Sequence, residues 1–99
     1  MEEVDFLKEK ETVKQIMADC WNLVKGQCFE KMTYETWKPF IDASDALVPK
    51  YKEMGSRYVI LYRSMFNDLL NFVMNMQDSA GNEAYWVPPK KDEKKEGKK

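Results

Sequence analysis

Apolar residues recur at steps of three and four along the first quarter of the chain, the spacing of an amphipathic helix. The apolar stripe consists of Val13, Ile16, Met17, Cys20, Leu23 and Val24. Phe6 extends it backward by seven residues, so the predicted helix begins near Val4, with acidic residues in its first turn, and stops at Gly26. Trp21 lies just off the stripe, at the border between core and surface.

A second, shorter helix is predicted after Thr33, which is a favourable N-cap residue. Pro39 does not fit a helix interior. It either ends a single turn or lies in the first turn of a helix that starts at Thr36. The apolar spacing leaves open a helix that continues to Leu47.

The middle of the chain reads as a hairpin. Residues 50–53 fit an exposed edge strand between Pro49 and the turn signal of residues 54–56. Residues 57–63 (RYVILYR) are rich in aromatic and β-branched side chains, and they are predicted as a central strand.

The last third is expected to contain one helix and one strand. Ser64 is predicted to cap a third helix, whose apolar positions run from Met65 to Met76. Residues 83–87 read as a short strand that ends at two prolines. The expected fold class is therefore α+β, with helices packed on a small two- or three-stranded sheet.

The length of 99 residues allows one domain, assigned to residues 1–89. Residues 90–99 hold six lysines, three acids and no apolar side chain, and they are predicted to form a disordered lysine-rich tail. Their balance is +3, which leaves ten basic and fourteen acidic residues, a balance of −4, in residues 1–89. A body of that sign disfavours a phosphate backbone, so nucleic acid is expected to bind weakly if it binds.

Few residues are suited to catalysis. The chain has no histidine, and its four glycines form no phosphate-binding motif. Asp42 and Asp45 fit a solvated helix face better than an acid–base pair. Cys20 and Cys28 are interpreted as reduced thiols, with Cys20 buried. We therefore expect no enzyme activity, no cofactor and no metal site.

The longest apolar run has five residues, from Tyr58 to Tyr62, against about 18 for a membrane span. No signal peptide is visible at the start of the sequence. These features predict a cytoplasmic protein that has no membrane partner.

Thirteen aromatic side chains are more than a core of this size can enclose. Exposed aromatic residues are common anchors of protein interfaces. The candidates for partial exposure are Trp21, Tyr34, Trp37, Phe66 and Trp86. The alternative for each is a place in the core.

Residues 34–40 (YETWKPF) resemble the helix-two signature of the N-terminal interaction domain, domain I, of the bacterial replication initiator DnaA. The surroundings are similar as well: a Trp-containing helix precedes the motif, and a Gly-containing turn and an apolar segment follow it. The resemblance spans roughly residues 13–88. It implies an αα-ββ-α-β fold of the K-homology type, without catalytic activity.

The resemblance also implies partners and sites. Such domains dock the replicative helicase or initiation regulators, which would place partner binding at Tyr34, Trp37 and Phe66. They also self-associate through the first helix, which would place a weak homodimer contact at Trp21. On this interpretation Trp37→Ala unfolds the domain, whereas Phe66→Ala leaves it folded and weakens partner binding.

The leading hypothesis is thus a non-catalytic protein–protein interaction module of bacterial DNA replication initiation. A weak nucleic-acid-binding module of the K-homology type is an alternative, although the G-x-x-G loop of such modules is missing. A phage- or mobile-element-encoded inhibitor of a host protein is another.

Overall fold

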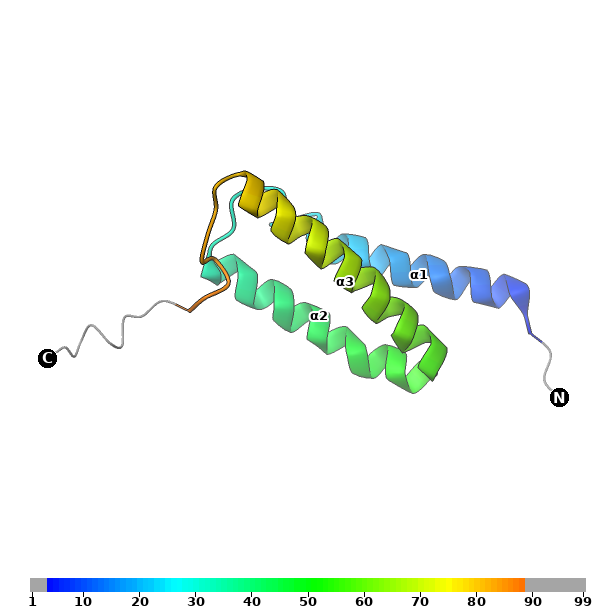
Figure 1. Ribbon diagram of the computed structural model, residues 1–99. Coiled ribbons are helices and arrows are strands. Elements are labelled where there is room, and N and C mark those ends of the chain that lie inside the picture. Colours follow the sequence, from blue (N-terminus) through cyan, green and yellow to red (C-terminus); the bar gives the residue numbers. More distant parts are fainter. Residues whose placement is uncertain (1–3, 89–99) are drawn as a thin grey trace, which may run out of the picture.

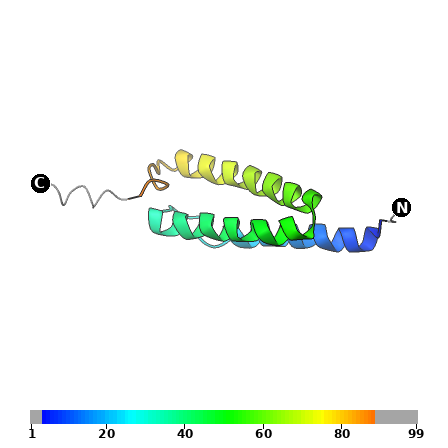
Figure 2. The same ribbon diagram turned by 90° about the horizontal axis from the view of Figure 1, so that it is seen from below.

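The computed structural model describes residues 4–88, and it contains three α-helices. They are α1 (Phe6–Val24), α2 (Tyr34–Met54) and α3 (Ser56–Ser79). Figure 1 shows that α1 and α3 run in the same direction, while α2 runs in the opposite direction. The first turns of α1 extend past the ends of the other two helices (Figure 2).

Short polar contacts define where α1 and α2 begin. Asp5 precedes α1, and its carboxylate accepts a hydrogen bond of 3.1 Å from the backbone N–H of Lys8. Thr33 precedes α2 and forms a capping box with Thr36, as the sequence predicts for this N-cap. Each pair satisfies backbone groups that the first turn of a helix leaves without partners.

Two prolines lie inside α2, at Pro39 and Pro49. Each removes one backbone donor, so the carbonyls of Glu35 and Asp45 lose their helical partners. All four residues are exposed, and water can therefore hydrogen-bond these carbonyls. The helix thus runs uninterrupted from Tyr34 to Met54 and absorbs the expected edge strand of residues 50–53.

The core is built around a continuous series of aromatic rings between α2 and α3. Neighbouring ring centroids lie 5.3–6.1 Å apart along the series. In order, the rings are Tyr85, Trp37, Phe40, Phe66, Tyr62 and Tyr51. Contacts of this kind add roughly 0.5–1.5 kcal/mol per pair to the burial of the rings. α1 covers the series with Ile16, Cys20 and Val24.

Two buried polar side chains join separate elements through hydrogen bonds. The Tyr62 hydroxyl donates to the backbone carbonyl of Ser44 at 2.7 Å and so joins α3 to α2. The Gln77 side chain accepts from the backbone N–H of Met32 at 3.0 Å and donates to the carbonyl of Glu30 at 2.7 Å. Gln77 therefore fastens the end of α3 to the loop between α1 and α2.

The α+β prediction was wrong, because the described residues 4–88 form helices and turns with no strand. The expected central strand, residues 57–63, is the start of α3. Local β-propensity gave the wrong answer because Tyr58, Tyr62 and Phe66 are spaced by four and continue the helical apolar stripe. Packing of that stripe against the other helices outweighs the propensity of single residues.

The expected last strand, residues 83–87, is also a series of turns and bends. The first helix and the Thr33 start of the second were predicted correctly. Within residues 4–88 no helix has the length and apolar content needed to cross a membrane. The predicted tail, residues 90–99, lies outside the described residues.

Candidate functional site

Two of the predicted partner-binding residues belong to the core. Trp37 is half-buried and packs edge-on against Tyr85 at 5.3 Å and against Phe40 at 5.7 Å. Phe66 is also half-buried. It packs against both halves of the core, the cluster that contains Phe40 and Val73 and the cluster that contains Tyr51 and Tyr62. The two residues thus have the Phe40 ring as a common neighbour. Tyr34 is half-buried at the start of α2.

Trp21, the predicted self-association residue, lies apart from these three. Its side chain is 54% exposed, and its ring lies 6.2 Å from that of Phe29, which is 51% exposed. Met17 lies one helical turn before Trp21 and is exposed to a similar extent. Three large apolar side chains therefore adjoin one another on the surface.

This apolar surface continues onto α3. Phe29 and Met76 line the same small cavity, and Phe72, which is 56% exposed, lies one turn before Met76. We call the combined surface the α1/α3 patch. It consists of Met17, Trp21, Phe29, Phe72 and Met76.

Both helices turn this patch away from α2. On α1, Asp19 accepts hydrogen bonds from Lys50 and Tyr51 of α2, and Trp21 lies about 200° further round the helix. On α3, Leu70 lines a cavity with Ser44 of α2, and Phe72 lies again about 200° further round. The patch therefore lies on the side of α1 and α3 that faces away from α2. These two helices run in the same direction (Figure 1).

The border of the patch is mainly basic. Lys10, Lys14 and Lys25 project within about 40° of the direction of Trp21 around α1, and all three are exposed. Lys31 lines the small cavity with Phe29, as does Glu30. Asp68 lies one turn before Phe72. None of the four lysines forms an ion pair with another residue of the described chain.

The cysteines are unsuited to nucleophilic chemistry. Cys20 and Cys28 are free and buried. Burial raises the pKa of each thiol to about 11, with a further contribution from Asp19 at Cys20. Both therefore stay protonated at neutral pH. Across residues 4–88 no three potential metal ligands cluster.

Sequence reasoning identified Trp21 but missed Phe29 and Phe72. Phe29 follows the expected helix stop and had no periodic neighbour. The sequence does contain a signal for the exposure of Phe72. It stands four residues from both Asp68 and Met76, which places it on a helix face outside the core stripe of α3.

The comparisons found no matching family model, curated protein or solved structure. Nothing identifies the chain as a relative of DnaA domain I, and nothing supports the replication role that the resemblance implied. The mixed fold expected from that resemblance is also contradicted by the three helices.

Proposed function

We propose that this protein is a non-catalytic interaction module that binds an amphipathic helix of another protein in the groove between α1 and α3. The observation that carries the proposal is the exposure of Trp21, Phe29 and Phe72 by about half, together on one surface. Side chains of this kind are enriched among the energetic anchors of interfaces.

The shape of the surface favours a helix as the ligand. Two parallel helices form a groove, into which the apolar face of a third helix can place side chains at positions i, i+3, i+4 and i+7. Such a ligand would lie beside α1 and α3 on the side opposite α2 and complete a four-helix arrangement.

The charges favour acidic flanks on that helix. The patch is bordered by four lysines, which form no ion pair within residues 4–88, and by two acids. Glutamates beside the apolar stripe of the ligand would meet these lysines at the edge of the interface, where opposite charges speed association. A basic ligand would be repelled.

The proposal is tested with two synthetic helical peptides that share a leucine stripe and carry either glutamates or lysines on the flanks. In isothermal titration calorimetry we expect the glutamate peptide to bind, more weakly as salt increases, and the lysine peptide not to bind. Equal binding of both peptides, or of neither, would contradict the proposal.

Variants locate the binding surface. Trp21→Glu and Phe72→Glu are expected to abolish binding without changing the thermal unfolding curve. Ile60→Glu is the matched control, because Ile60 is 62% exposed on α3 outside the patch. This variant should bind the glutamate peptide as tightly as the unmodified protein does. Loss of binding in Ile60→Glu alone would place the site elsewhere. A dimer in sedimentation experiments that Trp21→Glu disrupts would overturn the proposal in favour of self-association.

A further inference from the structure

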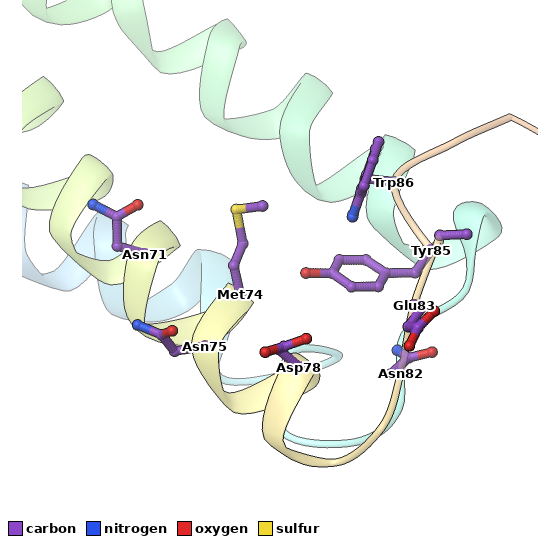
Figure 3. Close-up of a pocket in the computed structure, with 9 residues that line it drawn as sticks. Asn71, Met74, Asn75, Asp78, Asn82, Glu83, Tyr85 and Trp86 are labelled. Atoms are coloured by element: carbon purple, nitrogen blue, oxygen red, sulfur yellow. The ribbon is translucent and has the colours of Figure 1, made fainter.

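A second candidate site lies at the C-terminal end of α3, on the far side of the described chain from the start of α1. The segment after α3 folds back and leaves a cavity of about 630 Å³ between itself and the helix. Its lining combines amides, carboxylates and aromatic rings (Figure 3). α3 provides Asn71, Met74, Asn75 and Asp78, and the returning segment provides Asn82, Glu83, Ala84, Tyr85 and Trp86.

The cavity is electrically negative. Asp78 and Glu83 line it, and no lining residue is basic. Neither acid forms an ion pair within residues 4–88. The last turn of α3 contains no basic residue, so no cation on that turn offsets the negative end of the helix dipole at the same place.

Tyr85 provides an independent sign of a ligand. Only 6% of this residue is exposed, yet its hydroxyl has no hydrogen-bond partner within the described chain. Figure 3 shows the ring projecting from the returning segment toward α3, with the hydroxyl in the cavity. Burial, and secondarily the charge of Asp78, raise the pKa of this hydroxyl. Because the hydroxyl faces the cavity and no described residue pairs with it, it is available to accept a hydrogen bond from a ligand there.

The wall of the cavity is held in place. Gly81 has φ +77° and reverses the chain after α3. The Asn82 amide then donates to Gln77 at 2.6 Å and to the backbone of Met32 at 2.9 Å. Ala84 takes the left-handed backbone conformation, with φ +62°, and sets the direction of the two aromatic residues that follow.

We propose that this cavity binds a guanidinium group, either of a small guanidine or of an arginine side chain in a peptide. The planar cation would stack on the Trp86 ring. Its N–H groups would donate to the carboxylates of Asp78 and Glu83 and to the Tyr85 hydroxyl oxygen. Met74 would contact the apolar stem. This site is separate from the α1/α3 patch.

The probes are butylguanidine, N-acetyl-arginine amide and, as a neutral molecule of nearly the same shape, N-acetyl-citrulline amide. Titrations are followed by NMR through the Trp86 indole N–H. We expect both guanidinium compounds to bind and the citrulline compound to bind at least tenfold more weakly. Tighter binding of the arginine amide supports a peptide as the source, and equal binding supports a small guanidine. Equal binding of the citrulline compound would overturn the proposal.

Substitutions test the roles of single groups. Asp78→Asn and Glu83→Gln should each weaken arginine amide binding about tenfold, the loss of one charge-assisted hydrogen bond. Tyr85→Phe should weaken binding several-fold without lowering stability, since the hydroxyl has no partner within the described chain. Asp68→Asn, an exposed acid of α3 outside the cavity, is the control and should bind normally. If all four variants bind alike, the site does not exist. Trp21→Glu should leave this binding intact, which separates it from the proposed function.

Discussion

At the scale of single residues, aromatic side chains of this protein divide into two groups that composition alone does not separate. One group forms the series of rings through the core, from Tyr85 to Tyr51. The other, which includes Trp21 and Phe29, lies on the surface. The sequence predicts that the protein has more aromatic residues than its core can enclose. Which of the rings are exposed depends on tertiary contacts, which the composition does not give.

Phe66 shows the consequence of this division. Its ring lies between those of Phe40 at 5.5 Å and Tyr62 at 6.1 Å and joins the two halves of the core. We expect Phe66→Ala to lower the free energy of unfolding by about 3 kcal/mol, because it removes a ring from the middle of the series. Trp37→Ala should have an effect of similar size, measured in urea melts.

This expectation differs from the split inferred from the sequence, in which only Trp37→Ala unfolds the domain. Phe72→Ala is the matched control, since that ring is 56% exposed and its removal should cost under about 1 kcal/mol. A Phe66→Ala protein as stable as Phe72→Ala would mean that Phe66 has a surface role.

At the scale of the elements, the starts of α1 and α2 were predictable. The start of α3 was predicted wrongly, at Ser64 instead of Ser56, because the helix–strand choice for the residues before Ser64 was wrong. Asp5 and Thr33 act locally, through hydrogen bonds to residues three positions away, so their signals are present in the sequence. Residues 57–63 carry two conflicting signals, β-propensity and a spacing of four, and the distant contacts with α1 and α2 decide between them. Pro39 and Pro49 misled the prediction of α2 in the same way. Both lie inside the helix, where their solvent-facing positions make them tolerable.

The turn between α2 and α3 depends on one glycine. Gly55 has φ +144°, a conformation nearly restricted to glycine, and a Cβ there would lie 3.2 Å from the Tyr58 ring. We expect Gly55→Ala to lower the free energy of unfolding by about 2 kcal/mol in chemical denaturation. Gly26→Ala is the control, because nothing lies within 4 Å of an added Cβ and its φ is not in the left-handed range. It should be neutral or stabilise by about 0.5 kcal/mol. Equal effects of the two substitutions would show that the turn tolerates a different geometry.

At the scale of the whole molecule, the two candidate sites depend on chain reversals that no local pattern encodes. The α1/α3 patch forms because α1 and α3 are parallel and the loop after α1 brings Phe29 beside Met76. The cavity forms because the chain turns at Gly81 and lays Tyr85 against Trp37. Of the residues in these two sites, the sequence predicted partial exposure for Trp21 and Trp86, which are 54% and 50% exposed. Trp21 was accessible to sequence reasoning because its place beside the apolar stripe of one helix is a local property.

Buried thiol and phenol groups in the core make the free energy of unfolding depend on pH in the alkaline range. Burial raises the pKa of Cys20 and Cys28 from 9.0 to about 11, and it raises the pKa values of Tyr51 and Tyr62 from 10.0. A group whose folded pKa exceeds its unfolded pKa binds its proton more tightly in the native state. Its stabilising contribution is therefore complete below the unfolded value and is lost as pH rises toward the folded one.

We accordingly expect the free energy of unfolding to be nearly constant from pH 7 to 8.5 and to fall above pH 9, where unfolded thiols begin to ionise. Each thiol contributes up to about 1.4 kcal/mol per pH unit, and the tyrosines add to the slope above pH 10. Urea melts at half-unit intervals of pH measure this slope. A variant with both Cys20→Ala and Cys28→Ala should be less stable at every pH but should show a flatter decline between pH 9 and 10, because the buried tyrosines are then the remaining core groups with raised pKa values. An unchanged slope in that variant would contradict the prediction, because it would mean that the two thiols reach water in the folded protein.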